Sequence, residues 1–154
     1  MRSKTSLAVG LFAALYLAAC SGGGSYTCQP TQFGRAYPYG SPAFSYTNVW
    51  FYSDDQTLWA GLQAQEQESN ARFPYKGQTE WNIVWWRSDV AKFEGALSVE
   101  ARRLDTDSDP IIGESIAIKP DQFLTTLNVP SAGCWEVKGS NGDKSVTFVM
   151  ELTQ

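Results

Sequence analysis

The stretch CWEVKGSNGDKSVTFVMEL, Cys134–Leu152, decides the fold of this chain. In its first part the apolar Trp135 and Val137 are separated by the charged Glu136, which is the period of two expected for a strand with one buried face. The last part repeats this alternation with four apolar residues on one side: Val146, Phe148, Met150 and Leu152. An Asn-Gly pair between two alternating runs is the strongest short signal for a β-hairpin. We therefore predict two antiparallel strands joined by a turn at Gly139–Gly142.

The same alternation continues upstream of this hairpin. Val49–Tyr52 and Leu58–Leu62 bracket the polar Ser53–Thr57, which predicts a second hairpin. Further short apolar runs follow at Trp81–Trp86, Leu97–Arg102, Ile116–Ile118 and Phe123–Val129. About seven or eight short strands with turn signals between them are typical of an immunoglobulin-like β-sandwich. We predict a single all-β domain over residues 26–154, with an open barrel as the less favoured alternative.

The N-terminus has the pattern of a bacterial export signal. The basic start Met1–Lys4 precedes the uncharged Leu7–Leu17, and the sequence LAAC ends at Cys20. This ending resembles the lipobox of bacterial lipoproteins, in which the signal is removed and the cysteine carries palmitate-type acyl chains. We predict a signal peptide over residues 1–19 and lipidation at Cys20; an ordinary secretory signal with a chance cysteine is the alternative. The apolar run is shorter than the roughly 20 residues that span a bilayer.

Residues 20–25 hold the lipidated cysteine and a flexible Gly/Ser tether. Two or more acyl chains anchor a protein stably, so the expected partner is the membrane, reached through Cys20. Ser21 after the cysteine implies the outer membrane if the host is Gram-negative. The domain itself is expected outside the cytoplasm.

The charge balance disfavours a nucleic-acid partner. The 16 acidic residues exceed the 12 basic ones, and Arg2 and Lys4 among the basic ones lie in the signal. An acidic domain repels the phosphate backbone. We therefore expect no nucleic acid and no basic membrane-binding patch.

Lipidation of Cys20 leaves two cysteines, Cys28 and Cys134. In an oxidising compartment they are expected to form a disulfide; two unrelated thiols are the alternative. Cys134 has the parity of Glu136, opposite to Trp135, so its side chain should lie on the outer face of its sheet. Cys28 must then lie over that outer face.

Trp85 and Trp86 are neighbours on one predicted strand, so they cannot both face the core. If Cys28 holds the segment Tyr26–Tyr46 over the outer face, this segment would also cover Trp86. We state this as a hypothesis about the tertiary structure.

Three stretches resemble a group of uncharacterised bacterial lipoproteins and secreted proteins with an immunoglobulin-like sandwich. They are NVWFY at Asn48–Tyr52 with LWAG at Leu58–Gly61, IVWWR at Ile83–Arg87, and VPSAGCWEVKG at Val129–Gly139; RRLD at Arg102–Asp105 also fits. The resemblance spans roughly residues 48–152. It implies a fold and a location only, and it transfers no catalytic residue.

The sequence offers little for catalysis. It contains no histidine, which excludes Ser-His-Asp and Cys-His nucleophilic machinery and all His-ligated metal sites. It has neither a Walker pattern nor a Gly-x-Gly-x-x-Gly loop. Paired acids could serve glycoside hydrolysis, but no pattern marks two as neighbours among Glu80, Glu94, Glu100, Glu114, Glu136 and Glu151. We expect no enzymatic activity and no cofactor.

The acidic run Asp105–Asp109 is the only candidate metal site in the sequence. Alternating Asp side chains can converge on Ca²⁺, but Pro110 stands where an EF-hand loop needs glycine, and Ile116 where it needs glutamate. A solvated loop is the expected structure, and no metal is predicted.

Aromatic residues make up 14% of the chain, which is the one positive functional signal. Trp and Tyr are enriched at recognition surfaces and also fill cores. The candidates for a binding surface are Trp86, Tyr37, Tyr39 and Tyr46. Two functions stay open: a non-catalytic module that binds an envelope protein or a glycan, and an envelope accessory or protease inhibitor that uses a loop such as Gln63–Gln78.

Overall fold

The computed structural model describes residues 26–32, 47–63, 79–90 and 92–153. Regular structure within these ranges consists of nine strands. They are β1 (Thr47–Tyr52), β2 (Leu58–Gln63), β3 (Glu80–Arg87), β4 (Ser98–Arg103), β5 (Ile111–Ile112), β6 (Glu114–Lys119), β7 (Gln122–Asn128), β8 (Gly133–Asn141) and β9 (Lys144–Leu152).

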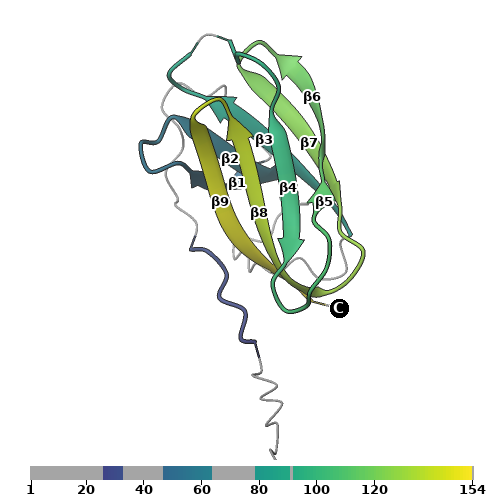
Figure 1. The fold of residues 1–154 in the computed structure, drawn as a ribbon. Helices are drawn as coiled ribbons and strands as arrows, with labels where there is room; N and C mark the ends of the chain where they lie inside the picture. The colour runs from purple at the N-terminus through teal and green to yellow at the C-terminus, as the bar shows by residue number, and fades with distance from the viewer. Residues whose placement is uncertain (1–25, 33–46, 64–78, 91, 154) are drawn as a thin grey trace, which may run out of the picture.

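The strands form two antiparallel sheets that pack face to face as a β-sandwich (Figure 1). The first sheet has the order β1-β2-β3-β7-β6, and the second sheet has the order β5-β4-β8-β9. Strands β2-β3-β7-β6 correspond to A-B-E-D of an immunoglobulin domain, β4-β8-β9 to C-F-G, and β5 to C′. Strand β1 extends the first sheet beyond this pattern. The predicted immunoglobulin-like sandwich is confirmed.

One of the nine strands, β5, was not predicted from the sequence. It consists of Ile111 and Ile112 alone, paired with Ala101 and Glu100 of β4. A run of two residues is too short to show alternation, so only pairing with a neighbour reveals it as a strand.

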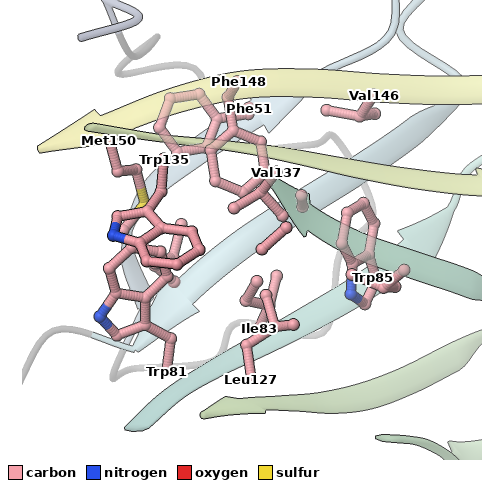
Figure 2. Packing of buried hydrophobic residues seen from close by; sticks show 14 of the residues in the cluster. Phe51, Trp81, Ile83, Trp85, Leu127, Trp135, Val137, Val146, Phe148 and Met150 are labelled. Carbon is pink, nitrogen blue, oxygen red and sulfur yellow. The ribbon is translucent and has the colours of Figure 1, made fainter. Parts of the chain in front are cut away.

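The core lies between the two sheets and is built around three tryptophans. Trp81 and Trp85 come from β3 and Trp135 from β8, and all three are fully or almost fully buried (Figure 2). The rings of Phe51 and Phe148 stack at a centroid distance of 4.1 Å. The alternating apolar residues of β8 and β9 all lie in this core, so the predicted buried faces of these two strands are confirmed.

The β8–β9 hairpin is present, but its turn lies two residues later than predicted. Asn141 pairs with Lys144, which leaves Gly142 and Asp143 as the turn. Gly142 has a φ of 61°, the left-handed conformation that glycine adopts at little cost at the first position of a type II′ turn.

Gly139, predicted as part of this turn, is instead a strand residue paired with Val146. It lies directly beneath the Trp85 indole: a Cβ atom added to Gly139 would stand 2.1 Å from Cη2 of that ring. The glycine at this position therefore provides space for a tryptophan of the opposite sheet. It does not form a turn.

The predicted disulfide between Cys28 and Cys134 is present, with a Cα–Cα distance of 5.5 Å. Cys134 has the parity opposite to Trp135, and it stays outside the core cluster that contains Trp135. Cys28 therefore lies over the outer face of the second sheet, as predicted. The same segment continues to the free edge of β9, where the Thr31 amide donates to the Val149 carbonyl and the Val149 amide donates to the Thr31 hydroxyl.

The hypothesis that the segment Tyr26–Tyr46 covers Trp86 stays a prediction, but its premise that Cys134 and Trp86 share one outer face is wrong. Cys134 belongs to β8 of the second sheet, whereas Trp86 belongs to β3 of the first sheet and points to that sheet's own outer face. The two outer faces lie on opposite sides of the sandwich. Of the predicted covering segment Tyr26–Tyr46, residues 33–46 lie outside the described ranges.

Candidate binding surface

The structure describes one of the four predicted surface aromatics. Trp86 is placed on β3, while Tyr37, Tyr39 and Tyr46 lie outside the described residues. So do Cys20 and residues 64–78 of the candidate inhibitory loop. Any surface built from described residues therefore starts from Trp86.

Trp86 belongs to a row of aromatic side chains that crosses three strands on the outer face of the first sheet. Tyr52 of β1 pairs with Trp59 of β2, and Trp59 pairs with Trp86 of β3. We call Tyr52, Trp59 and Trp86 the aromatic row. Trp50 lies beside it and meets Trp59 edge-on, with ring centroids 6.4 Å apart and an interplanar angle of 81°. Directly paired aromatics of this kind stabilise a sheet face.

Two of these indoles are fixed by hydrogen bonds at the turns. Trp86 Nε1 donates to Asp121 Oδ2 over 3.0 Å, and Trp59 Nε1 donates to the Gln56 carbonyl over 2.7 Å. Trp86 is only 6% exposed. It is therefore a rigid support of this face rather than an open platform.

Two other polar groups on this face are buried and have no hydrogen-bond partner among the described residues. They are Nε1 of Trp50 and both side-chain amide atoms of Gln122, the residue that pairs with Trp86. A buried polar group without a partner costs about 1–3 kcal/mol of stability. The face thus contains hydrogen-bonding groups that the described residues leave without partners.

Tyr52 brings the aromatic row to solvent. It is 38% exposed, and its ring lies 4.9 Å from that of Trp59. The sequence contained a signal for it: Val49 and Phe51 of β1 face the core, so Tyr52 has the outward parity. Sequence reasoning missed it because this alternation was used only to predict the hairpin.

The β1–β2 turn next to Tyr52 is tied to the β8–β9 turn. Lys144 Nζ lies 2.6 Å from Oδ2 of Asp55. The Lys144 ammonium, followed by the hydroxyls of Ser53 and Thr57, holds the pKa of Asp55 well below its usual value. This contact brings the two turns together at one end of the sandwich, which we call the loop end.

A second network ties the β3–β4 connection to the same end. The guanidinium of Arg87 donates to both carboxylate oxygens of Asp89 and to the Asn141 side-chain carbonyl. The Asn141 amide in turn donates to the carbonyls of Glu94 and Ala96. Hydrogen bonding to Asp89 raises the pKa of Arg87 and lowers that of Asp89. The loop end is therefore held by buried or half-buried polar contacts.

The first residue of the acidic run Asp105–Asp109 is paired with a nearby arginine. Both carboxylate oxygens of Asp105 accept hydrogen bonds from Arg103, over 2.5 and 3.0 Å. Asp107 and Asp109 are exposed. Among the described residues no group of three Cys, Asp or Glu side chains is arranged to hold a metal ion.

No family model, curated protein or solved structure matches this chain. The resemblance to lipoprotein and secreted sandwich domains thus stays a prediction. Across the described ranges, none of the chain forms a helix that is long and apolar enough to cross a membrane.

Proposed function

We propose that the chain is an extracytoplasmic lipoprotein, held on a membrane through acylated Cys20, whose immunoglobulin-like domain is a non-catalytic binding module. The loop end faces away from the membrane, and Tyr52, supported by the buried tryptophans of the aromatic row, contacts an envelope protein or a glycan. The observation that carries this proposal is the position of the disulfide relative to the aromatic row.

In this proposal the disulfide keeps the acylated Cys20 near one end of the sandwich. Cys28 follows Cys20 by eight residues, and a flexible tether of this length has a root-mean-square reach of roughly 16 Å, shorter than the sandwich is long. Cys134, its partner, is the second residue of β8. The membrane therefore lies near the end at which β8 begins, where Figure 1 shows residues 26–32 and the C-terminus.

The loop end is the opposite end of the same strand. β8 continues from Cys134 to Asn141, a rise of roughly 23 Å at about 3.3 Å per residue. The aromatic row borders the loop end, because Tyr52 is the last residue of β1 and Trp86 the penultimate residue of β3. A tether at Cys28 would thus present Tyr52 outward.

The chemistry of this end suits recognition. Tyrosine and tryptophan combine a large apolar ring with a polar atom and dominate many binding surfaces. Here the rings are already ordered by neighbours and by the Asp55–Lys144 contact. Binding would therefore require little loss of side-chain freedom.

The proposed membrane anchoring is tested by replacing Cys20. With Cys20→Ser, we expect labelled palmitate to be lost from the protein and the protein to leave the membrane fraction, because two acyl chains supply the membrane affinity. Cys28→Ser is the matched control: it removes a cysteine close to the tether and should keep both the label and the membrane fractionation. A Cys20→Ser protein that still fractionates with membranes would contradict the proposed anchor.

The binding surface is tested by comparing two exposed tyrosines. Tyr52 borders the loop end, and Tyr26, 49% exposed, lies next to the disulfide at the anchor end. We expect Tyr52→Ala to weaken binding about tenfold, the scale of one lost aromatic contact, and Tyr26→Ala to leave it unchanged. Tryptophan fluorescence measures binding of peptidoglycan fragments and glycans, and a photo-cross-linker at position 52 or 26 measures contact with envelope proteins. Equal effects at both positions would place the binding surface elsewhere.

A further inference from the structure

The chain passes from the second sheet to the first at the side of the sandwich formed by β5 and β6, and the edge strand β6 has an unusually apolar surface. β5 ends the second sheet and β6 ends the first, and Gly113 alone joins them. A Cβ atom added to Gly113 would lie 2.5 Å from Cγ2 of Thr125, so the crossing is closely packed. β6 is consequently a firmly held strand that pairs with β7 on one side only.

Within the part of the chain that the structure describes, the outer edge of β6 lacks the usual protection of an edge strand. Proteins place charges or proline within such strands because their unpaired N–H and C=O groups invite another strand. In β6 the middle residues are instead Ile116, Ala117 and Ile118, and the two isoleucines are 61% and 41% exposed. Charges occur only at its ends, Glu114 and Lys119.

The order of these end charges selects the kind of strand that would fit. Glu114 pairs with Thr126 of β7, and Lys119 pairs with Gln122, so both charges lie on the outer face of the first sheet. The irregular register between Ala117 and Lys119 makes this possible, because in a regular strand residues five apart would face opposite sides. A strand with an acidic start and a basic end complements itself when it runs antiparallel.

We propose that β6 is a self-association edge, at which two copies of this chain pair antiparallel about a two-fold axis near Ile116. The first sheets of the two copies then form one continuous sheet. Ile116 meets Ile116 on its outer face, and Glu114 of each copy lies at the Lys119 end of the other. A parallel pairing would place like charges together. The complementarity is built into a single strand, which favours a second copy in a closed dimer over an unrelated partner.

Lys119 also has a contact within its own chain. The proposed pairing of two β6 strands depends on the positive charge of Lys119 at the end of the strand. It does not require that the Lys119 side chain has no other contact. This inference concerns β6, which β7 separates from β3, the strand of the aromatic row that carries Trp86. It holds whether or not the aromatic row binds a ligand.

Cysteine cross-linking tests the two-fold axis. Directly opposed residues of antiparallel strands have Cα atoms about 4.5–5.5 Å apart, within the range of about 4.4–6.8 Å that a disulfide spans. We expect Ile116→Cys, as full-length protein in isolated membranes and after purification, to give a covalent dimer upon mild oxidation. The control is Ile112→Cys on β5, at the edge of the other sheet: this position is 67% exposed, more than Ile116. It should give at least about tenfold less dimer.

Charge exchange tests the strand direction. Glu114→Lys should reduce dimer formation by Ile116→Cys several-fold, and adding Lys119→Glu should restore it, because the antiparallel pair is then complementary again. Intact Cys28–Cys134 pairing, measured by mass spectrometry, shows that each variant is folded. Equal cross-linking at positions 116 and 112, no recovery in the double charge variant, or a cross-linked product containing a different protein would each overturn the proposal.

Discussion

Replacing both Cys28 and Cys134 with serine is expected to lower the free energy of unfolding by about 4–5 kcal/mol. The two cysteines are 106 residues apart in sequence. In the chain-entropy description, a cross-link that closes a loop of about 100 residues stabilises the folded state by about 4.7 kcal/mol. Domains of this size are stable by about 5–15 kcal/mol in total. The double variant should therefore unfold at a much lower urea concentration, measured by tryptophan fluorescence.

Reduction of the unaltered protein provides the control for this experiment. Dithiothreitol should produce the same loss, and it should change nothing further in the double serine variant. If the free energies of unfolding of oxidised and reduced protein, both from urea denaturation, differ by less than about 1 kcal/mol, the cross-link does not constrain the unfolded chain as described. The contacts of Thr31 with β9 would then hold the N-terminal segment by themselves.

Gly139→Ala is expected to destabilise the domain by about 3 kcal/mol, although alanine is the smallest possible addition. The new Cβ would stand 2.1 Å from Cη2 of Trp85, and the Trp85 ring is fully buried between the sheets. Overpacking a core commonly costs about 1–3 kcal/mol, and more when the neighbour cannot move. Urea denaturation of the purified variant measures the loss.

A second variant shows whether this loss comes from the Trp85 ring. Trp85→Leu removes the obstructing ring and by itself costs several kcal/mol, on the order of the 3–5 kcal/mol of large-to-small core changes. Combined with Gly139→Ala it should cost at least about 1 kcal/mol less than the two losses added, since neighbours in contact are not additive. Gly142→Ala is the control: its Cβ meets nothing within 4 Å, so its smaller loss should simply add to that of Trp85→Leu. Additive losses for Gly139→Ala as well would show that the ring is not the cause.

Several features of the fold follow from residues close together in the sequence. The alternation around Trp135 and Val146 predicts β8, β9 and their buried faces, because side chains of a strand point to opposite sides in turn. The same reasoning separates Trp85 from Trp86. It also places Cys134 on an outer face. These predictions succeed because each depends on parity within one strand.

The candidate binding surface was less predictable. Trp86 was a candidate from the start, but its own strand does not show that it pairs with Trp59, bonds to Asp121 and is almost fully buried. The exposure of Tyr52 likewise depends on its place at the end of β1. Neighbours across strands decide such exposure, and a single strand's pattern does not contain them.

The amino-acid sequence alone was sufficient for the sandwich class, both hairpins and the pairing of Cys28 with Cys134, because period-two patterns and a count of available cysteines are properties of the chain itself. Only the tertiary structure assigned Cys134 and Trp86 to outer faces of different sheets. It also gave Gly139 its role beneath Trp85 and left β6 at an edge. These features depend on which distant strands pair and pack, and contacts between distant strands leave no local period along the sequence.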